Sequence, residues 1–209
     1  MQLYTFPQSH NSLRVTATAY GAGIALEPRF VDLAKAEQHK PEFLKLNPNH
    51  KVPTLVDGDF VLWESPAIML YLAERNPAAG LVPRDLHQRM HMHQWIAWDT
   101  MQFTPAEHVY IYEYRVKSKL RLGEPDSVRL EAAAKNYHEY AAVLDGHLKG
   151  RTWLVGNTCT LADFHVVAPM IHAASCHFPL TGYREIRRWS DHVFQTQAWQ
   201  QAYTDAYGR

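Results

Sequence analysis

Three short segments near the start of the chain combine residue types that could bind or activate a small molecule. The first, Ser9–Ser12, follows a β-like run and precedes a helical pattern, so its hydroxyls stand at an expected helix N-terminus. A helix N-terminus has unpaired N–H groups and about half a positive charge, and it therefore attracts anions. The alternative is plain capping, in which Asn11 or Ser12 accepts a backbone hydrogen bond.

The second segment, Lys51–Leu55, places a proline at the start of an expected strand. Pro53 cannot donate to a strand ladder, and a cis bond before it would leave the backbone of Val52 available to an extended ligand. The alternative is an ordinary edge strand that begins at a proline.

The third segment is Glu64-Ser65-Pro66. It predicts a helix start with Ser65 as N-cap and Pro66 as the first helical residue. The O–H and N–H of Ser65 could hold a carboxylate while Glu64 accepts an ammonium group, which would fit the free α-amino acid end of a ligand. The alternative is a helix cap with Glu64 on the surface.

Other chemistry-bearing residues fit structural roles. Thr160–Asp163 has the pattern of a capping box, which stabilises a helix start. His87 and His91 are four residues apart, but position 88 is Gln, so the pair lacks the HExxH motif and we expect no metal site. The two cysteines exclude a disulfide framework, a four-cysteine zinc site and a CxxC pair.

The first third of the chain alternates between strand and helix patterns. Its order, β-α-β-α-β-β-α, predicts a mixed sheet with helices on its faces. Asp57-Gly58 between two β-rich runs predicts a hairpin. The expected strands are Gln2–Phe6, Ala25–Leu33, Val52–Val56 and Phe60–Trp63, and the expected helices are Ser12–Gly21, Pro41–Leu46 and Ser65–Glu74.

After Arg75 the strand signals nearly vanish, which predicts a separate all-α domain. We expect a first domain over residues 1–76, a linker over 77–84 and a helical domain over 85–209. The helical stretches are Asp85–Lys119, Asp126–Leu148, Thr160–Cys176 and Tyr183–Tyr203.

The overall charge and composition exclude some classes of function. Lys and Arg number 21 and Asp and Glu number 21, so the formal net charge is zero and a general nucleic-acid binder is not expected. A hydrophobic content of 46% is typical of a chain with a packed core. No run approaches the ~18 apolar residues of a membrane span, and no secretory signal is visible, so we expect a cytoplasmic protein that does not bind membranes.

Taken together, these motifs resemble the cytosolic glutathione transferases. The resemblance rests on the serine at the first helix, on PEFLKLNPNHKVPTLVDGDFVLWESPAIMLYL from Pro41 to Leu72, and on TLAD at 160–163 of the helical half. It implies an α/β thioredoxin-like N-terminal domain, an all-α C-terminal domain and a homodimer. It also implies glutathione as co-substrate, without a metal, and a glutathione thiolate that is conjugated to a small hydrophobic electrophile.

The resemblance also implies roles for individual residues. Ser9 matches the catalytic serine of the theta, phi and zeta-like classes and the cysteine of the beta class, whereas Tyr4 lies near the catalytic tyrosine of other classes. Either Gln38 or His39 matches the residues that approach the glycine carboxylate, and our prediction is His39. The remaining glutathione-binding matches are Lys51, Val52 and Pro53 for the cysteinyl part and the glycine end, and Glu64 and Ser65 for the γ-glutamyl end.

A serine is chemically sufficient for this task. A thiol with a pKa of ~8.5 is only a few per cent thiolate at pH 7. Lowering that pKa by about two units needs roughly 2.7 kcal/mol of preferential thiolate stabilisation. One charge-assisted hydrogen bond contributes about 1.5–3 kcal/mol, so the Ser9 hydroxyl and the helix end together suffice.

Three further residues have looser predicted roles. His108 and Tyr112 are candidates for the second-substrate pocket, and Asp99 is a candidate to reach the ligand of the partner subunit. The alternative functions are another glutathione-dependent chemistry, such as peroxide reduction, dehalogenation or isomerisation, and a non-catalytic interaction module.

Overall fold

The computed structural model describes residues 1–208, which form two compact units. The first unit is Met1–Arg84 together with the C-terminal segment that starts at Phe194, and the second is Asp85–Val193. The domain boundaries expected from the sequence, 1–76 and 85–209, therefore remain predictions. The structure adds that the last helix packs within the first unit.

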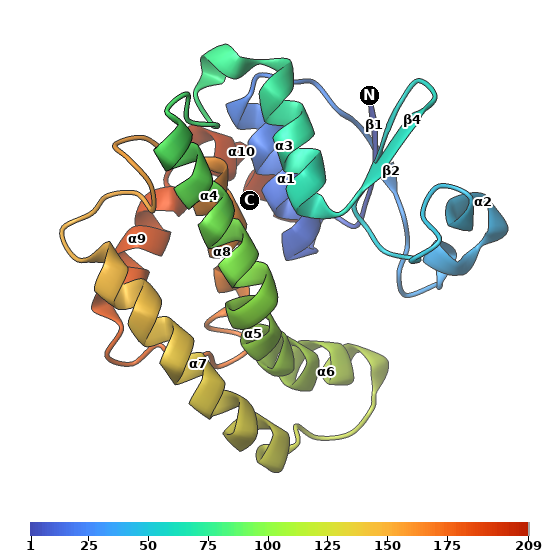
Figure 1. Cartoon of the computed structure of the whole chain (residues 1–209). Coiled ribbons are helices and arrows are strands. Elements are labelled where there is room, and N and C mark those ends of the chain that lie inside the picture. The colour runs from blue at the N-terminus through green and yellow to red at the C-terminus, as the bar shows by residue number, and fades with distance from the viewer. Residues whose placement is uncertain (209) are drawn as a thin grey trace. The chain divides into compact units, whose positions relative to one another are not determined.

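The first unit is built on a mixed four-stranded sheet of order β2-β1-β3-β4, as the sequence predicts (Figure 1). Strand β1 pairs in parallel with β2 and antiparallel with β3, and the β3–β4 pair is antiparallel. The elements follow the predicted order: β1 (Gln2–Thr5), α1 (His10–Gly21), β2 (Glu27–Phe30), α2 (Pro41–Leu44), β3 (Thr54–Asp57), β4 (Phe60–Trp63) and α3 (Ser65–Arg75).

Helices cover both faces of this sheet, with α1 packed against α3 on one face and α2 on the other (Figure 1). Side chains alternate along a strand, so Leu3 and Thr5 are buried toward α1, while Tyr4 packs edge-on against Phe43 of α2 at 6.1 Å. Burial of one large aliphatic side chain stabilises the fold by about 1.5–3 kcal/mol. The core of this unit includes Leu3, Leu13, Val15, Leu55, Ile68, Met69 and Leu72.

The last helix, α10 (Gln197–Tyr207), packs against α1 in the first unit. The sequence predicts one helical stretch over Tyr183–Tyr203, but the structure divides it into α9 (Arg184–Phe194) and α10. Thr196 causes the break, because it is extended and its hydroxyl accepts a hydrogen bond from the Trp199 N–H at 3.4 Å.

The second unit is helical, and residues 85–193, all of which the structure describes, contain no strand. The prediction of an all-α half is therefore confirmed. Its helices are α4 (Leu86–Trp98), α5 (Thr104–Tyr110), α6 (Lys117–Leu120), α7 (Ser127–Leu148), α8 (Leu161–Val167) and α9, with two π-helical segments, η3 (Asp99–Phe103) and η4 (Ile111–Val116), and a 3₁₀ segment, η5 (Ala168–His172).

The two π-helical segments interrupt the helix predicted over Asp85–Lys119. Near the first of them, Pro105 has no N–H to donate to the preceding turn. Asp99 lies there fully buried, accepts a hydrogen bond from Thr104 at 2.7 Å and pairs with His165 at 3.1 Å. These side-chain contacts stabilise the wider π-helical turn of η3. The spacing of apolar residues in the sequence does not predict this turn.

Helix α8 begins at the capping box predicted from Thr160 and Asp163. The Asp163 carboxylate is fully buried and accepts four hydrogen bonds, from the N–H groups of Leu154 and Thr160, the Thr160 hydroxyl and the Trp189 indole. Burial raises the pKa of Asp163, and the four donors oppose that rise. The Asp163 carboxylate thus connects the start of α8 by hydrogen bonds to Trp189 of α9 and to Leu154 in the loop before α8.

Both cysteines are free thiols in the second unit. Burial raises the pKa of Cys159, with Asp163 adding to the effect, and it also raises the pKa of Cys176. Among residues 1–208, no helix is both long and apolar enough to cross a bilayer, and no group of three His, Cys, Asp or Glu residues could hold a metal ion.

His172 links the stability of the fold to pH. Burial, assisted by Arg115 and Lys119, lowers the pKa of His172 to about 3. Between pH 6.5 and 3 the unfolded chain therefore binds the extra proton, and stability falls as the pH drops through this window. At pH 5 we expect His172 alone to lower the free energy of unfolding by about 2 kcal/mol relative to pH 7.5.

Urea denaturation of the His172→Gln variant at several pH values checks this prediction. The variant should lose less stability between pH 7.5 and pH 5 than the unchanged protein does. The matched control is His87→Gln, because His87 is exposed on α4. Equal pH slopes for the unchanged protein and the His172→Gln variant would contradict the assignment.

Candidate functional site

The three segments singled out in the sequence meet at one end of the sheet. Pairing of Tyr4 with Thr54 places the end of β1, and thus the loop to Ser9, beside the start of β3 at Pro53. Pairing of Thr54 with Trp63 places Glu64, which follows β4, at the same end. The sheet topology therefore brings the Ser9 segment together with two segments that begin 42 and 55 residues after Ser9 in the sequence.

Ser9 is the N-cap of α1, with the extended backbone that this position requires. Its N–H donates to the Phe6 carbonyl at 2.8 Å, and its side chain makes no capping hydrogen bond. The alternative, in which Asn11 or Ser12 caps the helix, is wrong, because both residues lie inside α1. The Ser9 hydroxyl is half-buried at the positive end of the helix, whereas Ser12 is fully buried.

Tyr4 occupies a different environment from Ser9. It lies in the middle of β1 and packs against Phe43 on the α2 face of the sheet. The sheet therefore separates the Tyr4 ring from α1, which lies on the opposite face. This geometry favours Ser9 over Tyr4 as the residue beside a ligand at the N-terminus of α1.

The turn before β3 is fixed by buried polar side chains. The Val52–Pro53 peptide bond is cis, and pairing of β3 begins only at Thr54, so Val52 lies outside the ladder. The Lys51 carbonyl accepts hydrogen bonds from the Asn47 amide at 2.8 Å and from the Thr54 hydroxyl at 3.3 Å. Asn47 and Thr54 are buried, so they hold this turn from within, while the Lys51 side chain is exposed.

The turn from β4 into α3 differs by one residue from the prediction. Glu64, rather than Ser65, is the N-cap, and Ser65 is the first residue of α3. Glu64 has a φ of 69°, which is rare for a residue with a side chain and costs about 1–3 kcal/mol. Such strain is typical of binding sites, and it leaves the Glu64 carboxylate exposed beside the helix end.

A hydrogen bond links the first turns of α1 and α3. The Ser65 hydroxyl donates to the Asn11 side-chain carbonyl at 3.4 Å, and Ser65 is only 7% exposed. Asn11 and Ser65 are 54 residues apart, so no local pattern announces their contact. Asn11, Asn47 and Thr54 are thus supporting residues that the sequence reasoning missed.

His39 and Gln38 are in different settings. His39 ends the short segment η1 (Glu37–His39), is exposed and packs against the ring of His50, with centroids 4.7 Å apart. The side-chain oxygen of Gln38 is buried and has no hydrogen-bond partner among residues 1–208. This arrangement favours His39 over Gln38 as a group that can meet a ligand carboxylate.

The three loosely assigned residues lie in the second unit. Asp99 is buried and already paired with Thr104 and His165, which favours a role inside its own unit over the predicted reach to a partner's ligand. His108 is exposed on α5. Tyr112 is 38% exposed, and the Arg129 guanidinium lies over its ring at 5.3 Å.

Comparison with known families agrees with this architecture. The model of the family described as glutathione S-transferase, N-terminal domain, matches residues 1–74, and that of the glutathione S-transferase, C-terminal domain, matches residues 101–196. A curated relative, glutathione S-transferase D7 of Drosophila melanogaster, is 28% identical over 204 residues, which span 96% of this chain and 88% of the relative.

Solved structures give the same result. A glutathione transferase from Pseudomonas putida, with one glutathione disulfide bound per subunit, is 25% identical, has a TM-score of 0.84 and is matched over 96% of this chain and 89% of that one. Glutathione S-transferase-I bound with lactoylglutathione is 26% identical, with a TM-score of 0.85 and coverage of 96% and 97%. The chain therefore belongs to the glutathione S-transferase family and is a glutathione-conjugating transferase.

Proposed function

We propose that this enzyme is a serine-type glutathione transferase in which Ser9 donates its hydroxyl hydrogen to the glutathione thiolate. The observation that carries the proposal is the position of Ser9, an N-cap residue whose hydroxyl makes no capping hydrogen bond. The side chain is therefore available at the positive end of α1. Its hydrogen bond stabilises the sulfur anion relative to the thiol, which lowers the thiol pKa and supplies the nucleophile.

The remaining contacts follow from the charges of glutathione, which has one ammonium group and two carboxylates at pH 7. The Glu64 carboxylate accepts the γ-glutamyl ammonium, and the N-terminal turn of α3 at Ser65 holds the adjacent carboxylate. The backbone of Val52, outside the ladder, pairs with the cysteinyl part beside Pro53. Lys51 and His39, both exposed, face the glycine carboxylate.

A titration of glutathione by calorimetry, followed by a panel of electrophiles, tests this function. We expect binding in the micromolar to millimolar range and conjugation of small hydrophobic electrophiles; aryl halides and enals are suitable probes. A hydroperoxide, a haloalkane and a maleyl compound in the same panel distinguish conjugation from peroxidase, dehalogenase and isomerase activity. Failure to bind glutathione would overturn the proposal and favour a non-catalytic module.

The Glu64→Gln variant tests the amino-acid end of the site. A hydrogen-bonded charge pair contributes about 1.5–3 kcal/mol, so we expect KM for glutathione to rise about 10-fold or more. Because the contact is the same in the ground state and the transition state, kcat should change little. The matched control is Glu74→Gln near the other end of α3. A fall in kcat without a rise in KM would contradict this role.

The working context of the enzyme is also a proposal. A homodimer in the cytoplasm, acting in detoxification, fits the family assignment. The apolar substrate would meet the helical unit, where His108 and Tyr112 remain the candidate contacts. Sedimentation of the purified enzyme gives the oligomeric state directly.

A further inference from the structure

The elements α5, η4 and α6 follow one another without a gap and form one helical run in the second unit (Figure 1). On one side of this run, the buried Glu113 carboxylate pairs with the Lys117 ammonium at 2.8 Å and with the Arg129 guanidinium at 3.0 Å. It also accepts the N–H of Asp126, the N-cap of α7, at 2.8 Å. Both cations on this side therefore have a carboxylate partner within the protein.

The other side of the run packs against η5 and the residues that follow it. Between ring centroids, Tyr110 lies 5.8 Å from Phe178, and Tyr114 lies 4.8 Å from His177. His172, the last residue of η5, is only 3% exposed. The segment that starts at His172 therefore lies along this side of the run.

Basic side chains from four elements gather on this second side. Burial lowers the pKa of His172, and the charges of Arg115, Lys119 and His108 lower it further. Burial and the Arg115 charge also lower the pKa of Lys119. Such effects require the groups to lie close together, because water and salt screen more distant charges. We call His108, Arg115, Lys119 and His172 the cationic cluster.

Arg115 lacks an anionic partner in the part of the chain that the structure describes. Its guanidinium is half-buried and has neither a hydrogen bond nor an ion pair among residues 1–208. The two carboxylates of the same helical run point elsewhere. Glu113 faces α7, and the charge of the fully buried Glu107 adds to burial in raising the pKa of Tyr137, also on α7.

An anion bound at Arg115 would correct this imbalance. A charge that is partly removed from water needs a partner of opposite sign, and here its neighbours are other basic groups. The planar donors of a guanidinium match the two coplanar oxygens of a carboxylate. A carboxylate also brings a single negative charge, which one guanidinium with a lysine beside it can neutralise.

We infer that Arg115 selects electrophiles that carry a carboxylate, which it binds through its guanidinium. This inference rests on the proposed function and refines its second substrate, because the cationic cluster includes His108, a candidate contact of that substrate. Lys119 and His108 add positive potential around the carboxylate. The preferred substrates are therefore apolar electrophiles with one negative charge.

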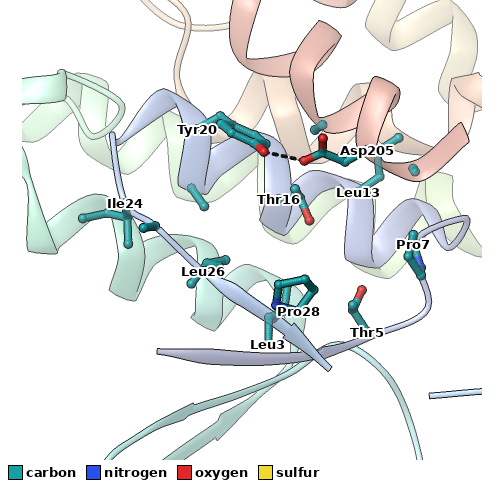
Figure 2. Close-up of a pocket in the computed structure, with 14 residues that line it drawn as sticks. Leu3, Thr5, Pro7, Leu13, Thr16, Tyr20, Ile24, Leu26, Pro28 and Asp205 are labelled. Atoms are coloured by element: carbon teal, nitrogen blue, oxygen red, sulfur yellow. Dashed lines mark hydrogen bonds between the residues drawn. The ribbon is translucent and has the colours of Figure 1, made fainter. Parts of the chain in front are cut away.

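A cavity in the first unit would not produce this preference. It has a volume of about 480 Å³ and lies between the β1–β2 edge of the sheet, α1 and α10 (Figure 2). None of its lining residues among 1–208 is basic, and the Asp205 carboxylate at its wall accepts a hydrogen bond from the Tyr20 hydroxyl. Asp205 repels a carboxylate, so a preference for anionic electrophiles reports on the cationic cluster.

Two enones that differ in charge test the inference. They are 4-phenylbut-3-en-2-one with a para carboxylate and the methyl ester of the same compound. The glutathione sulfur bonds to the β-carbon, the π electrons move to the carbonyl oxygen, and a proton from water converts the enolate to the ketone. Each kcat/KM is divided by the rate constant in buffer, which removes differences in intrinsic reactivity. We expect this corrected value to be about 10-fold higher for the carboxylate than for the ester, mainly through a lower KM.

The Arg115→Gln variant should lower this carboxylate-to-ester ratio to about one. The matched control is Arg121→Gln, which removes the same charge from an exposed residue at the end of α6 and should keep the ratio. Because both enones use the same fold and the same thiolate, the ratio separates lost binding of the carboxylate from lost folding.

The possible failures are distinct. A ratio near one in the unchanged enzyme, or an unchanged ratio in Arg115→Gln, would overturn the inference and leave the proposed function in place. An equal change in both rates on adding phosphate would assign the cluster to a free anion and would also overturn it. If neither enone reacts faster than in buffer, the proposed function fails and the inference fails with it.

Discussion

The Ser9→Ala variant is expected to conjugate glutathione with a kcat/KM about 10- to 100-fold lower than that of the unchanged enzyme. The change removes the hydrogen bond that, in the proposed mechanism, favours thiolate over thiol. The pKa of bound glutathione, measured by the ultraviolet absorbance of the thiolate, should therefore return toward the ~8.5 of a free thiol. Affinity for glutathione should change little, since the other contacts stay in place.

Two comparisons make this test specific to the Ser9 hydroxyl. Because the Ser9 side chain makes no capping hydrogen bond, Ser9→Ala should leave the free energy of unfolding nearly unchanged. Ser12→Ala is the matched control, since Ser12 lies in the same helical turn but is fully buried. If both variants lose the same activity, or if the thiol pKa does not move in Ser9→Ala, the proposed mechanism fails.

The Asp163→Ala variant is expected to lower the free energy of unfolding by about 3–5 kcal/mol. It leaves four buried donors without an acceptor, on Leu154, Thr160 and Trp189. Since whole folds are stable by only about 5–15 kcal/mol, the variant should be near the limit of folding at 37 °C. Urea denaturation of the variant and the unchanged protein measures the difference.

The Asp163→Asn variant shows whether hydrogen bonding is the cause. Each Asp163 oxygen accepts two hydrogen bonds, so an amide NH₂ in either position loses two of the four and faces two donors. We therefore expect a loss of about half that of Asp163→Ala. Trp189→Phe, which removes one donor, should cost less than either. A near-neutral Asp163→Ala would mean that the buried charge costs as much as its hydrogen bonds contribute.

Much of the fold follows from signals that are local in the sequence. The β-α-β-α-β-β-α order, the hairpin at Gly58, the long helix expected over Asp126–Leu148 and the Thr160–Asp163 capping box are all confirmed. Each of these is encoded within about ten residues by turn, cap or periodicity residues. Where the structure differs from the prediction, the cause is a contact between residues that are far apart in the sequence. Helix α9, for example, begins where the Asp145 carboxylate of α7 accepts the N–H groups of Glu185 and Ile186.

In the candidate site, too, some residues could be predicted from local sequence signals and others could not. Ser9, Lys51–Pro53 and Glu64-Ser65 are visible in the sequence because helix starts and prolines mark them, and the sheet register then places them at one end. The hydrogen bond between Asn11 and Ser65 is not visible, because it joins residues 54 positions apart. Asn47 lies only four residues before Lys51, but no sequence motif marks its hydrogen bond to the Lys51 carbonyl. The positive φ of Glu64 is equally hidden, since glycine is the residue that usually marks such a turn.

Cys176 is buried and Cys159 is half-buried, which has a consequence for an enzyme that works with a sulfur nucleophile. A raised thiol pKa keeps both side chains protonated and unreactive at neutral pH. The electrophiles that the enzyme handles should therefore alkylate the tripeptide and spare the protein, and oxidised glutathione should form few mixed disulfides with it. The catalyst is in this way protected from the reaction it promotes.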